Sequence, residues 1–501
     1  MFQGMDGPDI RSGFPGSLQL MPTMKKILVG AAALLTAGYL GLSGIAWYHD
    51  TLYAESAAAK PAASADATRV RDILDRNACY YCHSAKAVLP PYAALPGIRQ
   101  ISQFDVDKGQ RYFRLDPLFN ALRDGTPPAQ ADLAKLERVV TNDTMPPMRF
   151  RMVHWSTGLS QHDQQTLLTW ISHERKRWYV TPGVAPAFEN DPVQPLPHAL
   201  ATDPRKVALG MQLFHDPRLS VDNSISCASC HSLSTGGVDN RKRSLGVRGQ
   251  LGGVNAPTVF NAALNHMQFW DGRAATLQEQ AGGPPLNPVE MASASWDQIV
   301  GKLNADPSFS QAFVKVYPDG LSGPNITDAI AEFEKTLLTP SRFDAWLRGN
   351  SEALNSEEVR GYQLFKSVGC ASCHVGANLG GQSFERMGRA GDYFAARGDA
   401  LTDADNGREN VTHDTRDRQW FKVPGLRNVA LTAPYFHDGS VTDLREAVRK
   451  MAQYQLGTTL SEADVDALTA FLNALTGTYE PHAALTPSPT SAPSPALAAQ
   501  P

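Results

Sequence analysis

The stretch Cys227-Ala228-Ser229-Cys230-His231 decides the fold, because the same Cys-x-x-Cys-His pattern occurs twice more in the chain. The other two runs are Cys79-Tyr80-Tyr81-Cys82-His83 and Cys370-Ala371-Ser372-Cys373-His374, and the three together contain all 6 cysteines. This spacing is typical of c-type haem attachment, in which both thiols form thioethers to the porphyrin and the adjacent His binds the iron. The sequence therefore predicts three covalently bound haem c groups, with His83, His231 and His374 as iron ligands.

A zinc or disulfide site is the competing interpretation of paired cysteines. Zinc needs four ligands gathered in one place. The pairs here lie about 150 residues apart, with no second pair nearby. The spacing therefore favours haem.

Length and charge agree with a multidomain electron-transfer protein. The chain has 501 residues, 42% of them hydrophobic, and a formal net charge of -4. It can hold about three compact domains, and it has no basic excess that would indicate nucleic acid as a partner.

An uncharged apolar run over residues 27–47 follows Lys25-Lys26. It is long enough to span a bilayer with its amino end in the cytoplasm, which places everything downstream in the periplasm. We predict an anchor in the inner membrane over residues 25–48, preceded by an unstructured leader at 1–24. A cleaved secretory signal is the alternative, since Ala57-Ala58-Ala59 follows the run.

Composition divides the remaining chain into three haem blocks. Residues 49–68 and 181–200 are predicted linkers, and residues 481–501, rich in Pro, Ser and Ala, are a predicted disordered tail. The blocks are then an N-terminal haem domain at 69–180, a second at 201–340 and a third at 341–480. Helical patterns recur and long alternating strand patterns are absent from the sequence, so we expect a mainly α fold with three cytochrome c-like domains.

Methionines downstream of two haem runs are candidate second axial ligands. The first block offers Met145 and Met148, before a capping pattern at Ser160, and the third offers Met451, before another at Ser461. Thioether ligation raises the haem potential, which suits electron relay. A lone Met is also common as core filler, and the choice between Met145 and Met148 stays open.

The middle block lacks this arrangement and carries Gln280 and Glu290 instead. A carboxylate and an amide facing a haem with no strong second ligand make a plausible peroxide site. The carboxylate can move a proton between the peroxide oxygens, and the amide can hold the bound peroxide.

Further motifs make the chain similar to one known family. They are GGV at 236–238, NAPTVFNA at 255–262, QFWDGRA at 268–274, NPVEM at 287–291, VPGLRNVALTAPYFHDGS at 423–440 and EAVRKMAQYQLG at 446–457. Over roughly 201–478 the sequence resembles the bacterial dihaem cytochrome c peroxidases. The extra haem block, the CYYCH run, a TMPP segment at 144–147 and the anchor resemble the triheme, membrane-bound quinol peroxidases of that family.

The resemblance implies roles for individual residues. His231 would be the proximal ligand of the peroxidatic haem, with Glu290 as acid/base and Gln280 as the peroxide-orienting amide. Trp270 would conduct electrons between the two haems of the pair. His374 and Met451 would ligate the electron-transfer haem.

The resemblance also implies a calcium ion held by Asn255 and by the backbone carbonyls of Thr432 and Pro434, which are the oxygen ligands that calcium prefers. For His437, two interpretations stay open: a functional role and a packed loop histidine.

One position departs from the family pattern. Many dihaem peroxidases block the peroxidatic haem at rest with a loop His, and the matching residue here is Val247. Valine cannot ligate iron. We therefore expect an open haem, with His266 as the alternative substitute ligand.

The predicted activity is reduction of hydrogen peroxide to water, with electrons from membrane quinol or a small soluble cytochrome. Two alternatives are a dihaem oxidase that modifies a protein partner and a non-catalytic electron-transfer cytochrome. The first group carries Tyr where this chain has Met451, and the second needs neither an open iron nor Glu290. A homodimer is a further possible assembly.

Overall fold

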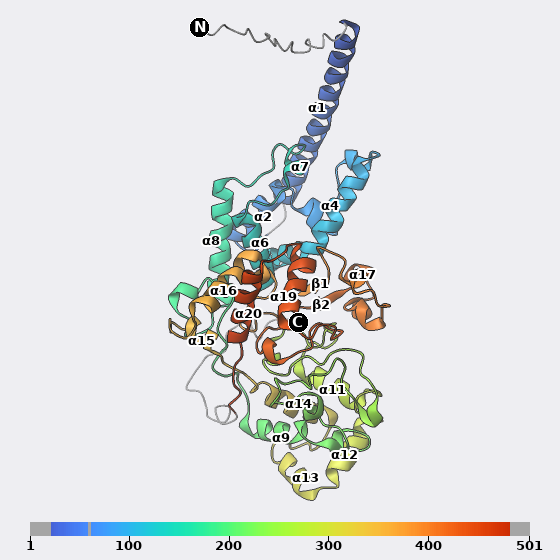
Figure 1. Cartoon of the computed structure of the whole chain (residues 1–501), viewed down its shortest axis with the longest axis vertical. Coiled ribbons are helices and arrows are strands. Elements are labelled where there is room, and N and C mark those ends of the chain that lie inside the picture. The colour runs from blue at the N-terminus through green and yellow to red at the C-terminus, as the bar shows by residue number, and fades with distance from the viewer. Residues whose placement is uncertain (1–21, 59–61, 481–501) are drawn as a thin grey trace, which may run out of the picture.

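The computed structural model describes residues 22–58 and 62–480 (Figure 1). Helices dominate, and strands β1 (Phe384–Arg386) and β2 (Trp420–Lys422) form one antiparallel pair with Phe384 opposite Lys422. The mainly α fold expected from the sequence is confirmed. The predicted tail at 481–501 and the predicted leader up to residue 21 lie outside the described residues.

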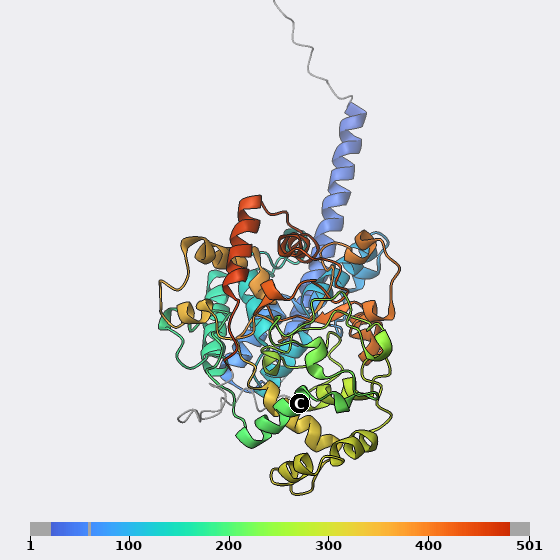
Figure 2. The ribbon, with the colours of Figure 1, turned by 60° about the horizontal axis from the view of Figure 1, so that its bottom comes forward.

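Helix α1 (Pro22–Ala58) projects from the body of the molecule as a single long rod (Figures 1 and 2). Its segment Thr23–Tyr53 is long and apolar enough to cross a membrane, and 6% of its apolar window is buried inside the protein. The predicted transmembrane segment at 25–48 falls within this helix. Because a secretory signal has the same length and composition, the membrane anchor stays a prediction.

The predicted linker at 49–68 is wrong for residues 49–58, because α1 continues through them to Ala58. Packing explains the extra turns. The Tyr53 ring stacks on Tyr80, with the ring centroids 3.4 Å apart, and His49 Nδ1 lies 2.7 Å from the Tyr81 hydroxyl. The end of α1 is therefore docked on the first haem block rather than tethered to it.

The first block is a bundle of short helices around the Cys79–His83 run. Its helices are α2 (Ala65–Arg76), α3 (Tyr80–His83), α4 (Ile98–Tyr112), α5 (Asp116–Asp124), α6 (Gln130–Thr141), α7 (Met148–Arg151) and α8 (Gln161–Trp178). Helix α8 begins with the expected capping box, in which Ser160 Oγ accepts from the Asp163 N–H and the Asp163 carboxylate accepts from the Ser160 N–H. Its apolar face buries Leu167 and Ile171 in the core of the block.

The second predicted linker, residues 181–200, is also not a free spacer. Val193 and Leu196 are buried, and Val193 forms a backbone bridge with Gly376. The Leu196 N–H donates to Asp344 Oδ1 at 2.7 Å, and Arg427 donates to the Gln194 carbonyl at 3.3 Å. The apolar side chains and satisfied backbone groups explain why this segment packs on the third block despite its prolines.

The second and third blocks lie on either side of residue 340, where the sequence predicts a boundary. The second contains α9 (Pro204–Phe214), α10 (Cys227–Cys230), α11 (Leu277–Leu286), α12 (Trp296–Asn304), α13 (Pro307–Val314) and α14 (Gly323–Glu334). The third contains α15 (Arg342–Leu347), α16 (Ser356–Val368), α17 (Tyr393–Arg397), α18 (Glu409–Thr412), α19 (Leu444–Met451), a π-helical turn (Ala452–Leu456) and α20 (Glu462–Ala474).

Both blocks are closed by the same helix crossing. At Gly210 of α9 a Cβ atom would lie 1.8 Å from the carbonyl oxygen of Ala329 on α14. At Gly361 of α16 it would lie 2.0 Å from the carbonyl oxygen of Ala467 on α20. Each glycine begins a Gly-x-Gln-Leu-Phe run, at 210–214 and 361–365. The two blocks therefore repeat one packing unit, in which glycine permits the backbones to touch.

We predict that Gly361→Ala destabilises the third block by about 1–3 kcal/mol, because the added methyl group meets helix backbone that cannot yield. Chemical denaturation of the holoprotein measures the change. The matched control is Gly301→Ala in α12, where nothing lies within 4 Å of the new Cβ atom. That control should be neutral or stabilising by up to about 1 kcal/mol, and equal destabilisation by both variants would contradict the packing argument.

Candidate haem and peroxide sites

Each Cys-x-x-Cys-His run folds as one helical turn. The backbone N–H of the histidine donates to the carbonyl of the first cysteine, at 3.2 Å for His83, 2.9 Å for His231 and 3.0 Å for His374. A turn of this kind brings both thiols and the imidazole to one side of the backbone. The geometry suits attachment of a flat macrocycle along that side.

The three imidazoles share a second constraint. The Nδ1–H of each donates to a main-chain carbonyl: His83 to Phe113 at 2.8 Å, His231 to Gly237 at 3.2 Å and His374 to Leu379 at 3.0 Å. Burial lowers the pKa of all three, so the rings are neutral. A neutral ring held through Nδ1 presents Nε2 as a metal ligand, which is the arrangement that iron-binding histidines require.

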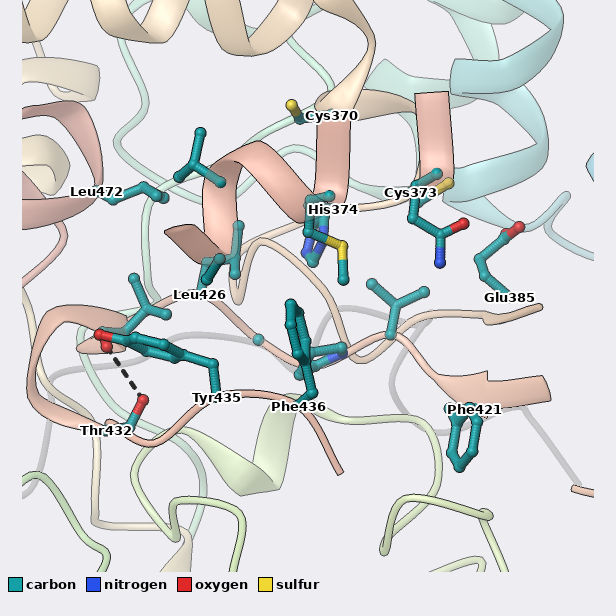
Figure 3. A pocket seen from close by; sticks show the side chains of 18 of the residues that line it. Cys370, Cys373, His374, Glu385, Phe421, Leu426, Thr432, Tyr435, Phe436 and Leu472 are labelled. Carbon is teal, nitrogen blue, oxygen red and sulfur yellow. Dashed lines mark hydrogen bonds between the residues drawn. The ribbon is translucent and has the colours of Figure 1, made fainter. Parts of the chain in front are cut away.

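A cavity of about 260 Å³ lies beside the third run (Figure 3). Cys370, Cys373 and His374 line it, and Figure 3 shows His374 extending from the helical turn toward Phe436. Met451, the last residue of α19, lines the same cavity. The structure thus brings together the two predicted iron ligands of the third block, His374 and Met451.

The charges around this cavity fit a haem. Lys422 of β2 lines it and is buried, yet its amino group has no hydrogen bond or ion pair with any side chain that the structure describes. Burial lowers the pKa of Lys422 to about 8. A buried cation needs a counter-charge, and the propionates of a porphyrin would supply one. The thiols, the neutral imidazole and the thioether could attach and ligate a haem, and this cation could pair with its propionates.

Trp270 joins the second block to the third. Its indole N–H donates to the carbonyl of Asn255 at 2.9 Å, and its own carbonyl accepts from the Lys422 N–H at 2.8 Å. The side chain lines the cavity beside His374. These bonds fix the ring at the boundary between the two blocks, where the sequence-based role of electron conduit requires it to lie.

The three residues predicted to bind calcium line the same cavity: Asn255, Thr432 and Pro434. The side-chain amide of Asn255 donates to the Arg241 carbonyl at 2.8 Å, which leaves its oxygen as a possible ligand. In the described part of the chain, no cluster of three His, Cys, Asp or Glu residues could hold a metal ion. A cation at this place would therefore depend on amide and backbone oxygens.

Glu290 lies in the second block, close to the Cys227–His231 run. Burial raises the pKa of Glu290, and Arg273 partly opposes that rise. Burial also raises the pKa of Cys230, and the carboxylates of Asp239 and Glu290 raise it further, so Glu290 is near enough to act on that thiol. A carboxyl group with a raised pKa beside a haem attachment point can both take and give a proton.

Val247 lies directly against Glu290. Its N–H donates to the Glu290 carbonyl at 2.8 Å, and its side chain is 1% exposed. At the preceding Gly246, a Cβ atom would lie 2.0 Å from the Val289 carbonyl oxygen, so only glycine fits there. At this loop the chain therefore has a buried apolar residue whose main chain is bonded to the main chain of Glu290.

The other residues of the predicted peroxide site are more dispersed. Gln280 is half-buried on α11, which ends at Leu286, just before the turn that carries Glu290. His266, the alternative substitute ligand, lies against the third block, where its Nδ1–H donates to the Gly381 carbonyl at 2.9 Å and its ring contacts Phe384.

His437 is a packed residue of the third block. It is buried, its ring stacks on Phe421 at 4.3 Å between centroids, and its Nε2 lies 2.8 Å from Asp405. Burial alone would raise the pKa of Asp405, but bonds from His437, Arg397 and Thr402 hold it well below its usual range. The arrangement agrees with the structural interpretation of His437.

In the first block, His83 is anchored as described, and the two candidate methionines differ in exposure. Met145 is half-buried, whereas Met148 is 69% exposed. An iron ligand must face the interior of its block, so burial favours Met145 over Met148.

The first block also contacts the third directly beside its haem run. Lys135 forms a buried ion pair with Glu385, and Glu385 lies 3.6 Å from Arg389. Arg389 lies over the Tyr112 ring, 4.9 Å from its centroid, and reaches Cys373 Sγ at 3.6 Å. Since Tyr112 precedes the residue that anchors His83, these contacts link the first and third haem runs.

Sequence reasoning missed this junction, the unpaired Lys422 and a buried Asp50–His154 pair at the base of α1. Asp50 alone carried a signal, as the first charged residue after the apolar run. The others come from separate parts of the chain and have no motif.

Comparisons with known proteins identify haem protein families along much of the chain. Residues 204–352 match the family described as di-haem cytochrome c peroxidase, and residues 39–173 match a haem-binding domain family. Cytochrome c peroxidase Ccp of Escherichia coli (strain K12) is 50% identical over 463 residues, which cover 92% of this chain and 99% of that protein.

Two further proteins are similar over more than half of this chain. Cytochrome c551 peroxidase of Nitrosomonas europaea is 46% identical over 291 residues, 58% of this chain and 85% of that protein. A crystal structure of a MauG-like protein associated with microbial copper homeostasis superimposes with a TM-score of 0.50 at 28% identity, covering 56% of this chain and 92% of that one. The chain belongs to the di-haem cytochrome c peroxidase family.

Proposed function

We propose that this protein is a haem-dependent peroxidase of the periplasm, held in the inner membrane by α1, that reduces hydrogen peroxide to water. The observation that carries the proposal is the half-buried Glu290 near Cys230 and bonded through its main chain to Val247, in a block whose sequence lacks the Met-plus-closing-helix pattern of the third block. The relatives named as cytochrome c peroxidases support the same activity.

Three covalently bound haem c groups are the proposed cofactors. Bound haem takes up electrons singly and, where one axial position of its iron is open, binds peroxide. His83, His231 and His374 would be the proximal ligands, with Met145 and Met451 completing the first and third sites. A calcium ion on Asn255, Thr432 and Pro434 is a further proposal, and these residues would then stiffen the boundary beside Trp270.

Mature protein should therefore keep the mass of three haems per chain after denaturation, because thioether bonds survive unfolding. Intact mass spectrometry of the denatured chain measures this. A mass corresponding to two haems or fewer in fully matured protein would contradict the assignment.

In the peroxide site, Glu290 would move a proton from the near to the far oxygen of the peroxide, and Gln280 would orient the molecule. The raised pKa of Glu290 suits a group that must both accept and return a proton. Val247 would leave room for peroxide where a histidine would compete for the iron. His266 stays the alternative substitute ligand, because its Nδ1–H donates to a main-chain carbonyl as in the three haem-run histidines, and its Nε2 would remain available to bind iron.

Glu290→Gln should slow peroxide reduction by about 10²–10⁴-fold while the three haems stay attached, because it removes a positioned acid/base and keeps the shape of the side chain. Steady-state peroxide consumption with a chemical reductant measures the rate. The control is Glu279→Gln, an exposed residue of the neighbouring helix, which should leave the rate unchanged. Equal rates for Glu290→Gln and the parent protein would remove Glu290 from the mechanism.

Electrons are proposed to come from membrane quinol, with a small soluble cytochrome as the alternative donor. They would pass from the first haem to the third and then, by way of Trp270, to the second. Docking of α1 on the first block supports quinol, since it holds that block against the surface where quinols reside. The contacts of Arg389 with Tyr112 and Cys373 support the first step of the relay.

Full-length protein in lipid nanodiscs should consume peroxide with decylubiquinol or menadiol as the sole donor, at a rate at least comparable to that with a reduced small cytochrome c. The reason is that the donor meets the first block at the membrane surface. Peroxide consumption with each donor in turn distinguishes the candidates. Turnover with the cytochrome alone would assign the donor to the soluble pool.

A further inference from the structure

A continuous chain of hydrogen bonds connects α1 to the first block. Tyr92 donates its O–H to His154 Nε2, and the Nδ1–H of His154 donates to Asp50 Oδ2 at 2.7 Å. The Tyr81 O–H donates to Asp50 Oδ1 at 2.9 Å and accepts from His49 Nδ1 at 2.7 Å. We name these residues the junction chain: Tyr92, His154, Asp50, Tyr81 and His49.

Two donors of the junction chain, His154 and Tyr81, meet on one carboxylate, that of Asp50. Asp50 is 6% exposed and His154 is 2% exposed, and among the side chains that the structure describes no lysine or arginine forms an ion pair with Asp50. A buried carboxylate with neutral donors is costly, and an amide could hold two elements together at a lower cost. The structure thus keeps a proton acceptor, the imidazole of His154, in direct hydrogen-bond contact with a carboxylate.

The junction chain has accessible ends. Tyr92 and His49 are half-buried, whereas the three residues between them are buried. A proton can therefore reach solvent at either end, and exit through His49 requires the Tyr81 hydrogen bonds to reverse. A purely structural network would need no such ends.

Exposed apolar side chains lie next to the Tyr92 and His154 end. On α7 and just after it, Met148, Met152 and Trp155 are 69%, 58% and 51% exposed. Phe104 on α4 is 52% exposed and lies under Arg149 of α7. Figure 1 shows α7 beside α1, on the side of the body from which α1 projects. Aromatic and apolar residues in such a position suit contact with the membrane interface.

From this geometry we infer that the junction chain is the quinol-oxidation site, in which Tyr92 meets a quinol hydroxyl and His154 accepts its proton. The inference rests on the proposed function, because it assumes quinol as the donor. Tyr81 belongs to the first haem run, so the buried middle of the junction chain lies beside the proposed electron acceptor. One place thus offers an apolar approach, a base and an electron acceptor.

The reaction balances with the established chemistry of both partners. A quinol loses two protons and two electrons and becomes a quinone. A haem held by the first block would accept the electrons one at a time, and two of them, with two protons, would convert one hydrogen peroxide to two waters. His154 would take one proton for each electron and pass its Nδ1 proton to Asp50, and a proton would continue to His49 once the Tyr81 O–H turns from Asp50 toward His49. No further oxidant or reductant is needed.

The test uses full-length holoprotein in nanodiscs and follows reduction of the first haem by absorbance after mixing with decylubiquinol or menadiol. His154→Gln should slow this reduction by about 10²-fold or more, because the amide cannot accept a proton. Tyr92→Phe, which removes a hydroxyl at a half-buried position, should slow it about tenfold. Reduction by dithionite, binding of decylubiquinone by calorimetry and the melting temperature should stay within about twofold or a few degrees of the parent values.

The matched control is Tyr39→Phe. The Tyr39 hydroxyl also bridges α1 to the first block, donating to the Met152 carbonyl at 2.5 Å, but it is not part of the junction chain. A normal rate for this control, together with slow rates for the two chain variants, supports the inference. The junction-chain inference would be overturned by equal slowing in all three variants, by loss of dithionite reduction in the chain variants, or by normal quinol rates in the chain variants. Each of these results would leave quinol intact as the proposed donor. Failure of the parent protein itself to accept electrons from quinol would overturn the proposed donor, and the junction-chain inference with it.

Discussion

The hydrogen bond from each histidine Nδ1–H to a main-chain carbonyl is the constraint around which the molecule is organised. It fixes the tautomer and the plane of His83, His231 and His374, and the carbonyl partner ties each haem run to the next segment of its block. In the first block that partner is Phe113, whose neighbour Tyr112 lies under Arg389 of the third block. The orientation of the His83 ring is thus coupled, through Phe113 and Tyr112, to the cavity beside His374.

Connections between the blocks also hold the haem runs in fixed positions relative to one another. Residues 181–200 are bonded to the third block, and Trp270 is held by bonds on both sides of the boundary between the second and third blocks. Electron transfer between haems requires constant distances between them, because a moving domain would change those distances at every step. Since these joints consist of buried ion pairs and backbone hydrogen bonds, the three blocks behave as one scaffold.

Much of this could be predicted from the sequence because the chemistry is local. The Cys-x-x-Cys-His spacing and the capping box at Ser160 are set within a few residues, and each forms as expected. The motifs around Trp270 and Met451 placed both residues beside the third haem run, where the structure has them. The buried pair Asp50–His154 joins residues more than a hundred positions apart, and no periodicity or spacing carries that information. The errors at 49–58 and 181–200 share one cause: Ala, Pro and polar composition indicates flexibility only where nothing packs against the segment, and here other segments do.

The docked end of α1 also makes the helix a lever. The uncharged run at 27–47 contains 21 residues, about 32 Å of helix, which matches a hydrocarbon layer of about 30 Å. A helix of that apolar length in a bilayer would have little mismatch to relieve by tilting. With the end of α1 fixed to the first block, any tilt of the helix would turn the whole body about its base, so the docked contact would set the angle at which the three blocks meet a membrane surface.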